Sequence, residues 1–342
     1  MVCAVEAHPD FPVILIHNRE EDWDRETEEP RLHEDGKVYA KDGQSGGSSF
    51  GFKPSTGAVA ALTNCRSKEE PPGDKTEWTS RGLLVLDALD ATTSTPQIDP
   101  EQFRSFNMFH GLALCDSPTM TYTCRCPHFG KWTTKSSVPL KPRVIYARSN
   151  EEHPDLSDDS WPKVAWLRAT IHRIIQTLPA GTEAIRLRDI MAEAMCKTLD
   201  ADAEFPDLAF SPLPSRIEKI MQRGPFVSFQ LLQELGDLPH GFRRYGTCSQ
   251  TIFISDRRRR RGIWFQRSTM NDDQTPGPWQ TWDAPWPSSE RRRSAGPLAR
   301  AKLWFGGLFR FVGSCPFLPL FWLRKLLVAG AGAAGGLWLW RR

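Results

Sequence analysis

The sequence lacks the features that place a chain in several common classes of protein. Its amino terminus has no basic region followed by a long apolar run and a cleavage site, so no secretory signal peptide is predicted. Eight cysteines in 342 residues are too few for a disulfide framework. The one closely spaced pair, Cys124 and Cys126, has no second pair at zinc-ligand spacing. A reducing, cytosol-facing protein without structural zinc is therefore expected.

A large surplus of basic charge is also missing. The chain has 44 Lys and Arg against 41 Asp and Glu, a formal net charge of +3, which gives no reason to expect nucleic acid as a partner. Gly46 and Gly47 are not followed by the Gly-Lys-Ser of a phosphate loop. No internal repeat recurs at a fixed period.

One basic cluster stands out near the end of the chain. It consists of Arg257, Arg258, Arg259, Arg260 and Arg261. Without interleaved aromatic residues, such a cluster does not predict nucleic acid binding. It is interpreted as a solvated hairpin turn, and contact with anionic lipid headgroups is the alternative.

Apolar periodicity predicts an α+β chain with helices between two groups of strands. Strands are predicted at residues 13–16, 37–40, 58–63, 109–114, 120–124, 144–147, 251–255 and 262–267. Helices are predicted at residues 83–89, 164–174 and 187–199, with a short amphipathic helix at 216–221. Two batches of strands fit an α+β fold better than a doubly wound parallel sheet.

The end of the chain has a different composition. Pro, Trp, Ser and Arg predict a linker at residues 274–302. Residues 303–323 are largely apolar but contain Arg310, and residues 326–340 carry no charge. The uncharged run would rise roughly 22 Å as a helix, less than the roughly 30 Å hydrocarbon core. Flanking basic residues and tryptophans nevertheless favour a membrane-anchoring tail at 303–342, with a helix docked on the globular part as the alternative.

The first 22 residues contain the densest group of chemically active side chains. Cys3 begins a strand, and the apolar run at residues 13–16 leads directly into a polar series. One strand can therefore deliver these polar side chains to one edge of a sheet. Their members are Asn18, Arg19, Glu20, Glu21 and Asp22.

Several separate blocks together resemble the NRDE family, also called the transport and Golgi organisation 2 family. The Asn-Arg-Asp-Glu signature is matched by Asn18-Arg19-Glu20-Glu21, and His8-Pro9-Asp10 precedes it as in the family. Further blocks follow in order at residues 46–51, 60–64, 80–82, 149–150, 161–164 and 245–247. The resemblance predicts one family domain at residues 1–273 and does not extend to the tail.

The resemblance implies the αββα four-layer sandwich of N-terminal-nucleophile hydrolases, two antiparallel sheets covered by helices. In related acylases, a cysteine exposed by removal of Met is the nucleophile and its own α-amine is the base, which titrates near pH 8. By position, Cys3 is the candidate nucleophile and Arg19 the group that favours its thiolate. Asp22 would orient the amine, and Asn64 and Asn150 would support the oxyanion.

Three departures from the family favour a pocket that binds over one that catalyses. Val2 precedes Cys3, so ordinary removal of Met would leave the thiol without its own free amine. Cys248 stands where the family usually has arginine, and Ser49 where it has tryptophan. The resemblance therefore implies a non-catalytic protein of Golgi or secretory-membrane organisation, or of lipid or haem-type ligand trafficking. The alternative is a cysteine amidohydrolase acting on a small or lipid-derived amide.

Neither interpretation requires a cofactor. Family members are discussed in connection with haem, and His8 and His17 are the nearest candidate ligands, but lone histidines rarely ligate and no metal site is predicted. The expected location is the cytoplasmic face of an intracellular membrane, which the tail and family name leave open between Golgi, mitochondrion and peroxisome.

Overall fold

The computed structural model describes residues 1–65, 78–90, 100–128, 131–150, 155–157, 162–196, 245–269 and 276–287. The described residues all lie in one compact unit, Met1–Pro287. The predicted helix at 216–221 and the predicted tail at 303–342 lie outside the described residues. No helix within the described ranges is long and apolar enough to cross a lipid bilayer.

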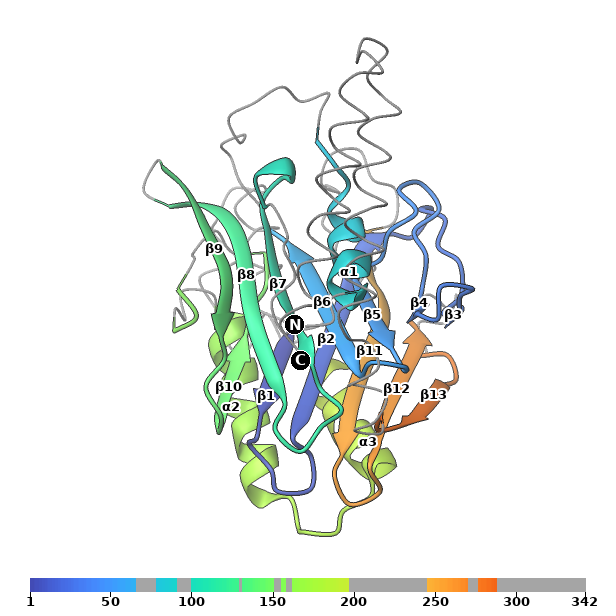
Figure 1. Cartoon of the computed structure of the whole chain (residues 1–342), viewed down its shortest axis with the longest axis vertical. Helices are drawn as coiled ribbons and strands as arrows, with labels where there is room; N and C mark the ends of the chain where they lie inside the picture. The colour runs from blue at the N-terminus through green and yellow to red at the C-terminus, as the bar shows by residue number, and fades with distance from the viewer. Residues whose placement is uncertain are drawn as a thin grey trace, which may run out of the picture. The chain divides into compact units, whose positions relative to one another are not determined.

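Two antiparallel sheets form the centre of this unit (Figure 1). The six-stranded sheet contains, in spatial order, β10 (Val144–Ala147), β1 (Val2–Val5), β2 (Val13–Asp22), β11 (Tyr245–Asp256), β12 (Arg261–Ser268) and β13 (Gln280–Pro285). The seven-stranded sheet contains β3 (Arg31–Leu32), β4 (Val38–Tyr39), β5 (Phe50–Lys53), β6 (Ala58–Asn64), β7 (Phe106–Leu112), β8 (Thr119–His128) and β9 (Lys131–Pro139). The predicted α+β architecture with two antiparallel sheets is confirmed.

Helices cover the outer face of each sheet. Helix α1 (Arg81–Asp90) packs on β5, β6 and β7, and the short 3-10 helix η2 (Pro100–Gln102) precedes β7. Helices α2 (Pro162–Thr177) and α3 (Ala184–Cys196) share an apolar cluster with the six-stranded sheet. The order of layers is therefore helix, sheet, sheet, helices.

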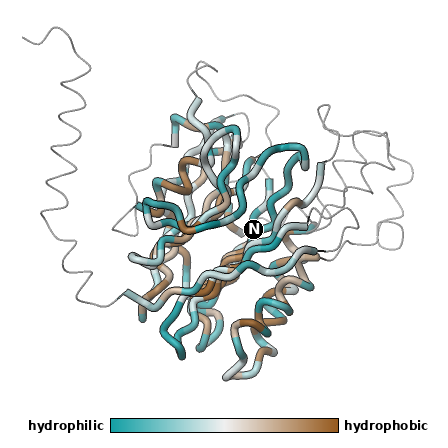
Figure 2. The backbone as a smooth tube through the Cα atoms, turned by 90° about the vertical axis from the view of Figure 1, so that its right-hand side faces the viewer, coloured by the Kyte–Doolittle hydropathy of each residue, from teal (hydrophilic) through white to brown (hydrophobic). Residues whose placement is uncertain are grey.

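Side-chain alternation along the strands builds two separate apolar layers. On β2, Val13 and Leu15 face the other sheet, whereas Ile14 and Ile16 face the helices. Between the sheets, the ring centroids of Phe50 and Trp264 lie 5.2 Å apart. Figure 2 shows the hydrophobic positions gathered along the inner strands and helices, with hydrophilic positions in the outer loops.

Strands β9 and β13 lie where the sequence pattern predicted none. Strand β9 is rich in Lys, Thr and Ser and has no buried residue, so it lacks the apolar alternation that marks a strand. Strand β13 falls within residues 274–302, for which the composition predicted a linker. It pairs with β12, and Trp282 packs against Trp264 with ring centroids 6.2 Å apart. Because of this contact, β13 belongs to the compact unit that extends to Pro287.

The arginine cluster at residues 257–261 forms the turn between β11 and β12. Four of its five side chains are paired with a carboxylate. The pairs are Arg257 with Glu6, Arg259 with Glu183, Arg260 with Asp116 and Arg261 with Asp283. Contact of this turn with lipid headgroups would have to compete with these ion pairs.

Candidate functional site

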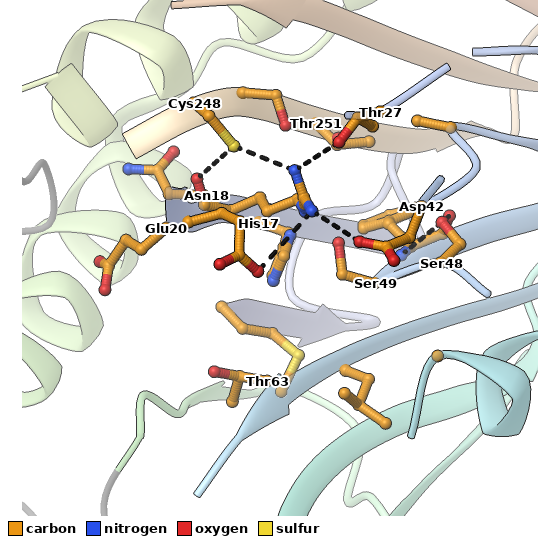
Figure 3. Close-up of a pocket in the computed structure, with 18 of the residues that line it drawn as sticks. His17, Asn18, Glu20, Thr27, Asp42, Ser48, Ser49, Thr63, Cys248 and Thr251 are labelled. Carbon is orange, nitrogen blue, oxygen red and sulfur yellow. Dashed lines mark hydrogen bonds and ion pairs between the residues drawn. The ribbon is translucent and has the colours of Figure 1, made fainter. Parts of the chain in front are cut away.

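A cavity of about 640 Å³ lies where β2 and β6 end and β11 begins. Its walls come from both sheets, from the start of α1 and from one side of α2 and α3. Figure 3 shows the polar side chains of β2 and β11 on one side and of the loop after β4 on the other. The cavity is thus built around the signature block at residues 18–21.

The signature block continues strand β2 instead of following it. Because side chains alternate along a strand, the block divides between two faces. Asn18 and Glu20 point toward the helices: Asn18 Nδ2 donates to the Met195 carbonyl at 3.1 Å, and Lys163 Nζ lies 3.4 Å from Glu20 Oε1. Arg19 and Glu21 lie on the opposite face of the strand. The block therefore contacts the helices on one face of β2 and the cavity side on the other.

Arg19 makes three directed contacts in the cavity wall (Figure 3). Its Nη1 donates to Thr27 Oγ1 at 3.0 Å and to Cys248 Sγ at 3.3 Å. Its Nη2 donates to Asp42 Oδ2 at 3.1 Å. The guanidinium is held by these partners and is only 3.8 Å from Glu21 Oε2.

Asp42 is the centre of the ionic network. It accepts hydrogen bonds from Arg25 Nε at 2.6 Å and Arg25 Nη2 at 2.8 Å, and from the Ser45 amide at 2.8 Å. Burial alone would raise the pKa of Asp42, but the hydrogen bonds from Arg25 and Ser45 outweigh it and hold the pKa well below its usual range. Asp42 therefore stays ionised between two arginines.

The Cys3 thiol lies in the core between the sheets and does not line the cavity. Cys3 is fully buried opposite Leu15 in the β1–β2 register, and burial raises its pKa. Met1 occupies the cavity wall instead, with its amine donating to the Arg148 carbonyl at 2.9 Å. Cys3 is two residues further along the strand than Met1, a separation of about 7 Å, so its thiol lies deeper in the core than the cavity wall.

Cys248 is the thiol that reaches the cavity beside Arg19. Burial raises the pKa of Cys248 despite the neighbouring positive charge of Arg19. Its Sγ also donates to the Arg19 carbonyl at 3.3 Å. The residue that stands in place of the family arginine thus forms a protonated, hydrogen-bonded part of the wall.

The other predicted site residues divide between the cavity and its surroundings. Asn64 and Asn150 line the cavity, and Asn150 Oδ1 accepts from Thr63 Oγ1 at 2.5 Å. Asp22 does not line it, and its Oδ1 accepts the Asp24 amide in a turn. The structure therefore brings Arg19, Asn64 and Asn150 together but leaves Cys3 and Asp22 outside the cavity.

Asp42, Arg81 and Lys163 are among the cavity residues that received no role from the sequence. Asp42 stands four residues before the Gly46-Gly47 block, Arg81 lies inside the 80–82 block, and Lys163 lies inside the 161–164 block. Because Arg81 and Lys163 lie in blocks that match the family, the sequence could have marked them as candidate site residues. Asp42 offered none, because its importance comes from partners 17 and 23 positions away.

The two histidines named as candidate haem ligands lie in different places. His17 lines the cavity, and burial first, then the amino-terminal charge and Arg19, lower its pKa to about 3, so its imidazole is neutral at physiological pH. His8 lies outside the cavity, with Nε2 3.3 Å from the Leu178 carbonyl. Most of the lining is polar or charged rather than the apolar wall that a porphyrin face requires. Within the described part of the chain, no group of three or more His, Cys, Asp or Glu could hold a metal ion.

The fold and cavity define the class of protein: an α+β sandwich of two antiparallel sheets with a polar cavity built around an Asn-Arg-Glu-Glu strand end. The chain belongs to the transport and Golgi organisation 2 family, whose sequence model matches residues 1–271. This is the family that the sequence blocks resembled. No curated protein and no solved structure matches the chain. The relation to N-terminal-nucleophile hydrolases stays a prediction.

Proposed function

We propose that this protein is a non-catalytic member of its family that binds a small molecule in the cavity and serves intracellular transport or secretory-membrane organisation. The observation that carries the proposal is the position of Cys3. A cavity of about 640 Å³ is large enough for a metabolite-sized ligand, yet the only amino-terminal thiol is buried behind its wall. Binding needs the cavity alone, whereas catalysis needs the thiol in it.

The cysteine amidohydrolase is the second candidate, and specific residues support it. Arg19, Asn64 and Asn150 line the same cavity, and the Met1 amine is part of its wall. Against it, the pKa of Cys3 is raised, so its thiolate is disfavoured at neutral pH. Activity would require a mature chain that begins at Cys3 and a thiol that turns into the cavity.

Native mass spectrometry of the wild type and of Cys3→Ala separates the two functions. Both proteins are expected to carry the same non-covalent small molecule, which is released on denaturation, because Cys3 does not touch the cavity. The intact mass of the same samples gives the amino terminus. A chain that begins at Cys3, or an adduct that survives denaturation and is lost in Cys3→Ala, would establish the amidohydrolase. Absence of any bound molecule, together with failure of a metabolite library to raise the melting temperature, would contradict the binding function.

We also propose that residues 303–342 attach the protein to a membrane. The support is their composition alone: apolar runs with tryptophans and basic residues at their ends. A protein truncated after Arg300 is expected to move from the membrane pellet to the soluble fraction of a cell lysate. Carbonate extraction of the full chain distinguishes an integral tail from a peripheral one, and continued pelleting of the truncated protein would refute the anchor.

A further inference from the structure

The cavity carries more positive than negative side chains. Its basic residues are Arg19, Arg25, Arg81, Arg104, Arg148, Lys163 and Arg267, and its acidic residues are Glu20, Glu21, Glu28, Glu29 and Asp42. These are seven cations against five anions. A cavity with this imbalance attracts anions.

The acidic residues of the cavity pair with partners other than Arg81 and Arg104. Asp42 and Glu21 lie beside Arg19 and Arg25, and Glu20 lies beside Lys163. The other two contact groups elsewhere: Glu28 pairs with Arg31 and Lys41, and Glu29 accepts from Gln280. None of these contacts reaches Arg81 or Arg104.

Arg81 and Arg104 form one wall of the cavity, where α1 begins and the chain enters β7. Arg81 Nη1 donates to the Ser105 carbonyl at 3.0 Å, which places its guanidinium beside the residue that follows Arg104. The same carbonyl accepts the Cys65 amide at 3.2 Å, so the end of β6 joins this wall. Neither arginine has a carboxylate partner among the described residues. Arg267, by contrast, donates to Gln250 and Cys196 and stacks on Trp279.

The electrostatics of the wall favour an added negative charge. Burial first, and the positive charge of Arg104 second, lower the pKa of Arg81 to about 10. Glu21 acts on Arg81 only through its field and already lies 3.8 Å from both Arg19 and Arg25. Arg104 is exposed and Arg81 partly buried, and an anion bound beside them would offset the repulsion between their positive charges.

We propose that the Arg81–Arg104 wall binds the carboxylate or phosphate group of an anionic ligand in this cavity. This inference rests on the proposed binding function and names the chemical class of its ligand. Arginine is suited to the task because its planar fork donates two parallel hydrogen bonds to either kind of anion. Asn64 and Ser80, which also line the cavity, supply neutral hydrogen-bonding groups.

Isothermal titration calorimetry with three probes at neutral pH and constant ionic strength tests the inference. The probes are sodium octanoate, octanamide of nearly the same shape but no charge, and inorganic phosphate. At least one of the two anions is expected to bind about tenfold tighter than octanamide, and Arg81→Gln and Arg104→Gln are each expected to weaken it by about tenfold. Tighter binding of octanoate or of phosphate identifies the preferred headgroup.

Matched variants separate binding from folding. Arg186→Gln removes an exposed arginine outside the cavity and is expected to leave affinity unchanged. Arg81→Lys keeps the positive charge and is expected to retain more affinity than Arg81→Gln, with an unchanged circular dichroism spectrum for all variants. Equal binding of octanoate and octanamide would overturn the anionic class while leaving the binding function intact. Failure of both anions to bind at millimolar concentration would also overturn the anionic class of the ligand. The proposed binding function fails on a different result, the absence of any non-covalent ligand from the native mass spectra of the wild type.

Discussion

Replacing Asp42 with asparagine is expected to lower the free energy of unfolding by about 2–3 kcal/mol, at or just below the cost of breaking a fully buried ion pair, because the partners keep some exposure. The Asp42 carboxylate is bonded to Arg25 and Arg19, whose side chains are 28% and 16% exposed. Asparagine fills the same space but leaves two guanidinium groups without their shared counter-charge. Urea unfolding followed by circular dichroism measures the change.

The pH dependence of the same variant gives a second test. The pKa of Asp42 is lowered in the folded protein, so its stabilisation is fully present above the unfolded value near 4 and is lost as pH falls through the folded pKa. The difference between wild type and Asp42→Asn should therefore shrink as pH falls from about 5 toward 2. A difference that stays constant over this range would show that the carboxylate charge is not its source.

An exposed pair of the same chemistry is the control. Asp283 pairs with Arg261 at 2.8 Å, with both side chains more than 40% exposed. Asp283→Asn is expected to cost less than about 1 kcal/mol, since solvent and salt screen such pairs. If both substitutions cost the same, Asp42 has no special role in the cavity wall.

The contrast between these two aspartates shows what the sequence could and could not predict. Apolar runs such as residues 13–16 and 251–255 specify buried strands by themselves, and both lie in strands of the six-stranded sheet. A carboxylate in a loop has no such local signature. Asp42 acquires its partners only when the loop after β4 folds against the end of β2, and that contact is a property of the tertiary structure.

Cys3 illustrates a second limit. Its position near the amino terminus and the family pattern made it the natural candidate nucleophile. Which way a strand residue points depends on register, and a shift of one residue reverses every side chain. The pairing of Cys3 with Leu15 and Tyr146 fixes the thiol between the sheets, two residues along the strand from the cavity residue Met1. The residue types were therefore predictable, but their division between core and cavity was not.

Gly47→Ala is expected to have the other large effect, because Gly47 packs directly against the backbone at the start of α1. A Cβ atom on Gly47 would lie 2.4 Å from the Gly82 carbonyl carbon and 2.6 Å from its Cα. These are backbone atoms of the first turn of α1, so no side chain can move aside. We expect a loss of about 3 kcal/mol in the free energy of unfolding, the upper end of the usual cost of overpacking.

The neighbouring glycine provides a matched control. Gly46 has a φ of +70°, and no atom lies within 4 Å of the position that a Cβ would occupy, so Gly46→Ala adds backbone strain without a clash. Its expected cost is about 1 kcal/mol, the penalty for a non-glycine residue in the left-handed region. If urea unfolding shows that the two variants lose the same free energy of unfolding, α1 can move away from the turn at Gly46 and Gly47 at little cost.

The Gly47 contact also connects the two charged parts of the cavity. The Gly47 carbonyl accepts the Asp42 amide at 2.9 Å, and the Ser48 amide donates to the Gly82 carbonyl at 3.1 Å. A side chain at residue 47 must therefore move either the loop that carries Asp42 or the turn that carries Arg81. If α1 moves, Gly47→Ala should weaken anion binding by more than Gly46→Ala does, even under conditions where both proteins are fully folded. If the loop moves instead, the variant should lose the pH dependence that Asp42 contributes and keep its anion affinity, so the two measurements together identify which side of the contact yields.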